Sequence, residues 1–309
     1  MLPDRCNYYL NRVSRTPLVP VQLSASLPLI WCKLEFLNPS GSTKDRIAQH
    51  ILTKAWREGR VRPGGTVIEA SSGSTSIAMA LASAQLGLRF IAVMPEGVSN
   101  ERVYMIRAFG GEIRLTKKED GILGAIAETE RLARECDGFL PRQFSNPENA
   151  QAHRLATARE ILDQIPGESV EAVAAGVGTG GTLVGLYQGF RDHGCNTIPV
   201  HARPVNHEGS TPEVECCSFS ARIPGVIDCV STIFRPHELE GLRMIEVEDD
   251  RALDATRQLL NLGFPVGPSS GLNLCAAMDV ARECAGNVVT IFPDRMERYF
   301  TSELFRPFR

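Results

Sequence analysis

The sequence predicts an α/β protein of two domains, each a twisted, mostly parallel sheet flanked by helices. Three observations support this class: short apolar runs rich in β-branched residues, helical patterns between them, and glycines that follow the helices. Strands that alternate with helices form parallel sheets covered on both faces. A chain of 309 residues, 43% of them hydrophobic, can build one or two such domains.

The elements follow one another in a regular order. Buried strands are expected at 66–70, 90–94, 112–116, 170–174, 198–201 and 288–292. Helices are expected at 44–56, 74–86, 101–109, 122–135, 182–191 and 250–262, with Gly59, Gly87 and Gly110 just past three of their ends. Turn-forming residues at 146–149 indicate a domain change there. The stretch 203–231 has no clear periodicity, which predicts a loop-rich excursion.

Charge and cysteine content narrow the functional class. A net charge of -3 without a long basic run predicts neither nucleic acid nor a membrane surface as partner. No signal peptide and no run of eighteen apolar residues is found, so we expect a cytoplasmic enzyme of small molecules. Nine cysteines without a CxxC pair predict reduced thiols and no metal site. The adjacent Cys216 and Cys217 are either reactive or ordinary loop residues.

Lys44 is the candidate for imine chemistry among only five lysines. Its helix places Ile47 and Ala48 on the inward face, and Lys44 lies three and four residues before them, on that same face. Desolvation lowers the pKa of an amine, so the neutral form can attack a carbonyl and form a Schiff base. The preceding 38–43 supplies a rigid turn, a flexible glycine and a hydroxyl N-cap. The alternative is an ordinary lysine extending to solvent from the first helical turn.

A glycine-rich turn at 176–182 joins an expected strand to an expected helix. Glycines let backbone amides converge on an anion, and Thr179 and Thr182 add hydroxyl donors, so the turn predicts a phosphate site. Gly176, Gly178 and Gly181 also satisfy the dinucleotide pattern. That pattern expects an acid at the end of the next strand, where this chain has none. Because Arg203 could hold a phosphorylated ribose, an NADP-dependent oxidoreductase stays open.

Two serine-rich turns also precede helices. Residues 71–76 contain five hydroxyls around one glycine, which predicts a site for a substrate carboxylate rather than only an N-cap. In the turn 267–271, either Ser269 or Ser270 meets a cofactor ring nitrogen or caps the following helix.

With these residues in place, the chain resembles the β-family, fold type II, pyridoxal-phosphate enzymes, and among them the cysteine synthases, particularly the B-type. The likeness runs nearly the full length. It rests on motifs at 15–19, 38–46, 69–75, 94–102, 143–147, 178–182, 267–271 and 294–299, in the family's order.

The resemblance implies a role for each candidate residue. Lys44 carries pyridoxal 5'-phosphate as an imine, and Ser74 contacts its ring. Ser269 meets its pyridine nitrogen. The phosphate lies on Gly178, Thr179, Gly180, Gly181 and Thr182, and the substrate carboxylate on Ser71, Ser72, Thr75 and Gln143. Residues 36–148 would form the substrate-binding domain. Residues 149–309 would anchor the cofactor, with 1–35 packing on them.

The implied reaction is β-replacement on O-acetylserine, or a similar activated serine, by sulfide or another thiol in a homodimer. Two departures leave alternatives open. The family has asparagine at Ser74 and glycine at Ser76, and relatives with this serine loop include cysteine desulfhydrases, which eliminate sulfide, pyruvate and ammonia from cysteine. The segment 203–231 departs from the family's glycine-rich pattern. A binding module without catalysis is the remaining alternative.

Overall fold

The chain divides into two compact units. The computed structural model describes residues 12–71, 73–205, 220, 222–226 and 230–308. The first unit contains residues 12–14 and Asn38–Glu148, and the second contains Arg15–Leu37 and 149–308. The chain therefore crosses from one unit to the other between Glu148 and Asn149, within the turn-rich region at 146–149.

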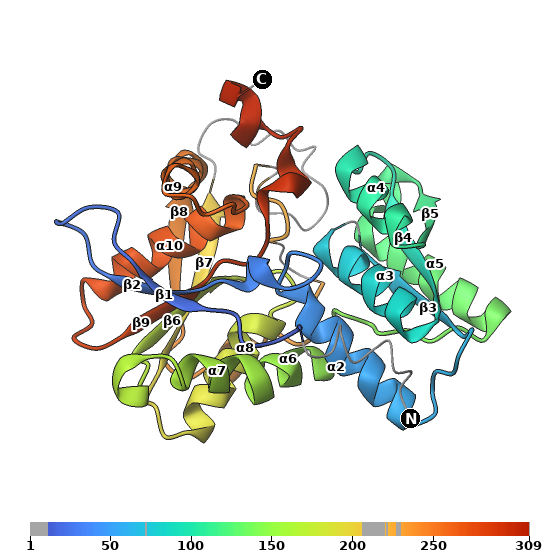
Figure 1. Cartoon of the computed structure of the whole chain (residues 1–309), viewed down its shortest axis with the longest axis horizontal. Helices are drawn as coiled ribbons and strands as arrows, with labels where there is room; N and C mark the ends of the chain where they lie inside the picture. Colours follow the sequence, from blue (N-terminus) through green and yellow to red (C-terminus); the bar gives the residue numbers. More distant parts are fainter. Residues whose placement is uncertain (1–11, 72, 206–219, 221, 227–229, 309) are drawn as a thin grey trace. The chain divides into compact units, whose positions relative to one another are not determined.

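The first unit is built on a three-stranded parallel sheet in the order β3-β4-β5. Its strands are β3 (Thr66–Ala70), β4 (Arg89–Pro95) and β5 (Glu112–Thr116), and its helices are α2 (Lys44–Arg57), α3 (Ser74–Leu86), α4 (Asn100–Ala108) and α5 (Gly121–Cys136). Helix α5 covers one face, where Ala125 and Leu132 join the core, and α3 covers the other (Figure 1).

The second unit is built on a six-stranded sheet in the order β1-β2-β9-β6-β7-β8. Its strands are β1 (Leu18–Val21), β2 (Ile30–Lys33), β6 (Ala172–Gly176), β7 (Ile198–Val205), β8 (Arg243–Glu248) and β9 (Val288–Ile291). Only β1 runs antiparallel to its neighbour; the other pairs are parallel.

Helices cover both faces of this second sheet (Figure 1). Helices α7 (Ala158–Leu162) and α8 (Gly181–Asp192) pack on one face, and α9 (Asp249–Asn261) and α10 (Pro268–Ala281) on the other. The short helix α6 (Glu148–Ala152) and a π-helix, His153–Thr157, lead into α7. Two 3-10 helices, η6 (Met296–Tyr299) and η7 (Glu303–Phe308), follow β9.

The predicted α/β class is confirmed, and several expected elements have the predicted bounds. Strands β3 and β5 and helix α3 match at both ends, whereas β6 begins two residues later than expected, at Ala172. The irregular stretch was expected to begin at Arg203, which is wrong. Strand β7 continues to Val205 because it pairs in parallel with β8, with Arg203 opposite Glu246. Cys216 and Cys217 lie outside the described residues.

Burial keeps two of the cysteines that the structure describes protonated. Cys32, Cys136, Cys195, Cys275 and Cys284 form no disulfide. Burial raises the pKa of the Cys32 thiol and raises that of Cys275 to about 11, which leaves both protonated and unreactive. None of the helices in the described ranges combines the length and apolar character needed to span a bilayer.

Candidate active site

Lys44 begins helix α2 at the end of a loop that an aspartate holds in place. Its side chain is half-buried, and the same helix buries Ile47 and Ala48 completely. The buried Asp45 carboxylate accepts a bond from Ser40 N at 3.1 Å and one from Ser40 Oγ at 2.6 Å. The lysine therefore leaves a fixed loop.

The hydroxyl that contacts the start of helix α2 belongs to Ser42 and not to Thr43, which occupies the N-cap position. Thr43 has helical backbone angles, φ -57° and ψ -19°, and its side chain makes no capping bond. The hydroxyl of Ser42 instead accepts a bond from Lys44 N at 3.3 Å. The carboxylate of Asp45, which is the second residue of the helix, reaches back and holds the loop by accepting a bond from Ser40 N.

Lys33 is more buried than Lys44, which sequence reasoning missed. Its ammonium is fully buried, and it donates to Thr16 O at 2.6 Å and to Glu160 Oε2 at 2.9 Å. Its contact with the Glu160 carboxylate makes Lys33 part of a structural ion pair. Lys54 pairs with Glu148 at the protein surface. Burial alone therefore does not identify the reactive lysine.

The serine loop lies between the end of β3 and the start of α3. Ser76 Oγ donates to Ser71 O at 2.6 Å, and Gly73 N donates to Ser71 Oγ at 3.2 Å. The N-cap of α3 is Gly73, so the serines do not serve as an ordinary side-chain cap. Ser74 is half-buried at the first helical position, and Ser72 lies outside the described residues.

Gln143 closes this loop from a turn that is distant in sequence. Thr75 Oγ1 donates to Gln143 Oε1 at 2.5 Å, and Gln143 Nε2 donates to Ala70 O at 2.8 Å. Because a carbonyl oxygen only accepts, the bond to Ala70 fixes which end of the amide is nitrogen. The structure thus brings three predicted substrate residues, Ser71, Thr75 and Gln143, together.

Glu69 is a further residue of this site, to which no role was assigned from the sequence. Its carboxylate is 3% exposed and accepts bonds from Ala70 N at 2.9 Å and Gln143 N at 3.0 Å. Burial raises the pKa of Glu69 to about 8, although these two bonds and the charge of Arg142 lower it. The available signal was an acid in the middle of a buried strand, a position that requires partners.

The glycine turn after β6 has the geometry of an anion site. Gly180, the N-cap of α8, has φ 80°, and a Cβ at Gly178 would lie 2.3 Å from Gly225 O. The first amides of an α-helix have no partner within the helix, and the helix dipole favours negative charge beside them. Thr179 and Thr182 lie at this turn, Thr179 buried and Thr182 partly exposed. A compact phosphate fits here.

The second serine turn, at residues 267–271, is fixed over the same edge of the six-stranded sheet as the glycine turn. Gly267 is the N-cap of α10, with proline next, so the alternative that Ser269 or Ser270 caps this helix is wrong. Asn273 lies one turn after Ser269. It accepts a bond from Gly176 N at 2.7 Å and donates to Ile291 O at 2.8 Å. It thereby ties α10 to the carboxyl ends of β6 and β9.

Two observations in the second unit fit the implied cofactor. The amides at the start of α8 can bind its phosphate. The fully buried Ser270 hydroxyl has no hydrogen-bond partner among the described residues, which fits a polar ligand atom near that turn. The structure brings the predicted residues together within each unit. Lys44, Ser71, Ser74, Thr75 and Gln143 are in the first unit, and Gly178–Thr182 and Ser269 are in the second.

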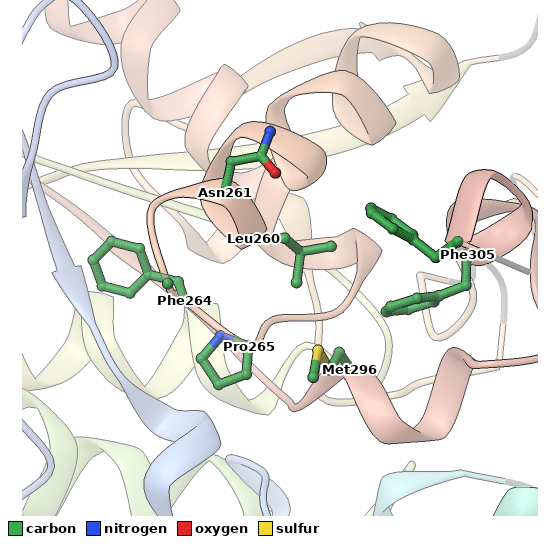
Figure 2. A pocket seen from close by; sticks show the side chains of 8 residues that line it. Leu260, Asn261, Phe264, Pro265, Met296 and Phe305 are labelled. Atoms are coloured by element: carbon green, nitrogen blue, oxygen red, sulfur yellow. The ribbon is translucent and has the colours of Figure 1, made fainter.

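A separate apolar pocket contains none of these residues. It has a volume of about 370 Å³ and lies where the end of α9 meets η6 and η7 (Figure 2). Its walls are Leu260, Asn261, Gly263, Phe264, Pro265, Met296, Phe305 and Phe308. Its lining has no ionisable group, so it lacks the groups that acid–base chemistry needs. No cluster of three or more His, Cys, Asp or Glu side chains suited to a metal occurs in the described part of the chain.

Known proteins resemble this chain over most of its length. A cysteine synthase of Staphylococcus aureus is 36% identical over 284 residues, which are 89% of each chain. A hydrogen sulfide-producing enzyme from Fusobacterium nucleatum matches 98% of this chain and 92% of its own, with TM-score 0.87 and 32% identity. An O-acetylserine dependent cystathionine β-synthase from Helicobacter pylori matches 96% and 98%, with TM-score 0.84 and 32% identity.

The family match decides between the cofactor hypotheses. The family described as "Pyridoxal-phosphate dependent enzyme" matches residues 9–294 of this chain, which include both serine turns and the glycine turn. The dinucleotide hypothesis for Gly176, Gly178 and Gly181 is therefore dropped, and Arg203 lies 3.5 Å from Glu246 at the sheet edge. The chain belongs to the pyridoxal-phosphate dependent enzymes.

Proposed function

We propose that this enzyme catalyses β-replacement on O-acetylserine, or a similar activated serine, with sulfide or another thiol, to form cysteine or an analogue. The observation that carries this proposal is the network of Ser71, Thr75 and Gln143. It presents hydroxyl and amide donors where a substrate carboxylate can bind. The 36% identity to a cysteine synthase supports it.

Each residue has a defined task in the proposed reaction. Pyridoxal phosphate, when bound, supplies an electron sink for charge at the substrate α-carbon. Gly178–Thr182 would hold its phosphate, and Ser269 and Ser74 would contact its ring. The amine of Lys44 would hold the cofactor's carbonyl carbon, would be released when the substrate amine takes its place, and would then accept the substrate α-proton at Nζ. Acetate would leave the β-carbon with its bonding electrons, the thiolate would bond to that carbon, and Lys44 would return the proton to the α-carbon.

The serine loop would orient the substrate for proton transfer. The side-chain amide of Gln143, which is held by its bond to Ala70 O, would contact a carboxylate oxygen of the substrate. Thr75 donates its only proton to Gln143, so Thr75 would act on the substrate mainly by fixing the amide. The role of Ser72 stays a prediction. We also propose that Asn38–Glu148 binds the substrate and that 149–308 anchors the cofactor.

Product analysis with and without a nucleophile tests this proposal. Purified enzyme with O-acetylserine and sulfide should form cysteine, while Lys44→Ala protein should lose at least about a thousandfold in rate because it lacks the base. A Lys54→Ala variant is the matched control, since Lys54 lies on the same helix and pairs with Glu148 at the surface. Normal turnover by Lys44→Ala protein would contradict the assignment.

Elimination of sulfide, pyruvate and ammonia from cysteine is a second candidate, which Ser74 favours. Serine replaces the family's asparagine, and a structural relative is a hydrogen sulfide-producing enzyme. If Ser74 favours elimination, Ser74→Asn should lower pyruvate formation from cysteine and raise replacement on O-acetylserine. Pyruvate release without an added nucleophile would assign elimination.

A homodimer in the cytoplasm is the assembly and location we propose, from the family resemblance and from the five described cysteines, which form no disulfide. Light scattering on the purified protein should give twice the chain mass of 33.8 kDa.

A further inference from the structure

Helix α8 packs very closely against the helical segment that precedes it in the chain, residues 148–162. Gly181, Gly185 and Gly189, spaced four residues apart, form one stripe along α8. A Cβ at Gly181 would lie 1.9 Å from Asn149 Oδ1, and one at Gly185 would lie 2.2 Å from Ala150 O and 2.7 Å from His153 Cβ. At Gly189 the nearest atom, Ala158 Cβ, would be 2.4 Å away. The glycines thus allow the two helices an approach that any side chain would prevent.

This approach lets two buried side chains reach the hydroxyls of the glycine turn. Asn149 and His153 are each 1% exposed and lie one turn apart. Asn149 Nδ2 donates to Thr179 Oγ1 at 2.9 Å, and His153 Nε2 lies 3.2 Å from Thr182 Oγ1. The hydroxyls of Thr179 and Thr182, which face the phosphate in the proposed function, are therefore each contacted by a buried side chain of the preceding helical segment.

His153 is itself fixed by the helix turn that follows. Its Nδ1 lies 3.0 Å from Thr157 Oγ1, and the segment His153–Thr157 is a π-helix. Turns of this kind inside α-helices are often found at functional sites. If Thr157 donates to Nδ1, the neutral ring carries its proton on Nε2 and donates it to Thr182.

We propose that Asn149 and His153 are positioning residues that orient the hydroxyl protons of Thr179 and Thr182 toward the cofactor phosphate. A hydroxyl has one proton and two lone pairs. Thr179 Oγ1 already accepts from Asn149 and, at 3.4 Å, from Gly181 N. Its own proton then points to the phosphate, and the same holds for Thr182 when His153 donates to it. The inference rests on the proposed use of Gly178–Thr182 as the phosphate site.

The test compares two ligands that differ only in the phosphate. Apoprotein is titrated with pyridoxal phosphate and, separately, with pyridoxal, with binding followed by absorbance. His153→Leu should weaken pyridoxal phosphate binding about tenfold, the effect of one hydrogen bond to a charged group, and should leave pyridoxal binding within about twofold. His153→Gln keeps a donor and should recover most of the affinity for pyridoxal phosphate.

A double-mutant cycle shows whether His153 acts through Thr182. In a Thr182→Val background, His153→Leu should change the affinity for pyridoxal phosphate less than about twofold, because the hydroxyl it orients is gone. Arg159→Ala, an exposed change on the same helical segment, should change neither ligand's affinity. Circular dichroism checks that each variant is folded.

Several results would overturn the proposal. If His153→Leu weakens the binding of pyridoxal and of pyridoxal phosphate equally, the effect is one of general packing. The same conclusion follows if His153→Leu weakens pyridoxal phosphate binding as much in the Thr182→Val background as in the wild type. If His153→Leu does not fold, Thr157→Val and His153→Gln carry the test, and a loss of both ligands' affinity in Thr157→Val would overturn the proposal. Failure of the wild-type enzyme to use O-acetylserine would refute the proposed reaction but leave this titration valid.

Discussion

Glu69, Gln143 and Thr75 form a chain of hydrogen bonds beneath the serine loop, and at the scale of single residues this chain holds the proposed substrate site. Glu69 fixes the backbone of Gln143, whose side chain is held between Ala70 O and the Thr75 hydroxyl. Each group is buried, so removing one partner leaves another without compensation.

Glu69 makes stability depend on pH. Burial raises its pKa from 4.5 to about 8, so between these values the folded protein keeps a proton that the unfolded chain releases. The free energy of unfolding therefore falls as pH rises through this window. Glu69→Gln removes that dependence. Its free energy of unfolding relative to that of wild type should therefore increase as the pH is raised from 5.5 to 9.

Urea unfolding at several pH values checks this prediction. Glu96→Gln is the matched control, because Glu96 is an exposed glutamate of the same unit. Parallel stability curves for wild type and Glu69→Gln would contradict the role given to burial.

Thr75→Val should raise KM for the amino-acid substrate about tenfold. The change keeps the side-chain volume but removes the proton donated to Gln143, so the amide loses its orientation. Cofactor affinity should stay unchanged. Steady-state kinetics with Thr75→Ser as the control, which keeps the hydroxyl, checks this. Loss of cofactor with unchanged KM would show that Thr75 serves another purpose.

Single polar residues were the least predictable part of the site. Lys44, Ser71 and Gln143 belong to sequence motifs, whereas Asn149 and His153 act through contacts with residues about thirty positions later, which no local pattern indicates. The hydroxyl N-cap was expected from the stretch 38–43 without a residue assigned; Ser42 makes the contact, and the carboxylate of Asp45 also reaches back to the loop.

The glycine stripe of α8 governs the site at the scale of elements. It sets the distance between α8 and the helical segment after Asn149, and hence the reach of Asn149 and His153. Gly176 is tied to α10 through Asn273, so three elements meet at the carboxyl edge of the sheet.

Gly185→Ala should destabilise the protein by about 1–3 kcal/mol, because its Cβ would lie 2.2 Å from Ala150 O and the helices must separate. Calorimetry should show the thermal midpoint fall by several degrees. Gln188→Ala, on the same helix, adds no atom and should have a much smaller effect. An unchanged midpoint in Gly185→Ala would mean that the helices can part at little cost.

Elements with a continuous apolar run were predictable, and those shaped by neighbours were not. Strand β3 and helix α3 have the expected bounds because both are almost wholly buried and therefore apolar. Strand β8 was missed because four of its six residues are exposed and charges interrupt the apolar run. The π-helix at His153–Thr157 has no known sequence signal.

At the scale of the whole molecule, the predicted class, family and cofactor are confirmed. The family's motifs are spread over both units, and the match spans residues 9–294. Specificity was less predictable, because Ser74 departs from the asparagine that the family resemblance implies and much of the segment that follows Val205 lies outside the described residues.

The identity of the lysine that carries the cofactor is the central claim. Reduction of the holoenzyme with borohydride fixes the cofactor covalently to that amine, and mass spectrometry of the peptides then locates it among five lysines. The pyridoxyl mass should appear on the peptide that contains Lys44 and be lost in Lys44→Ala protein. The same mass on Lys33 or Lys54, or on no lysine, would contradict the account.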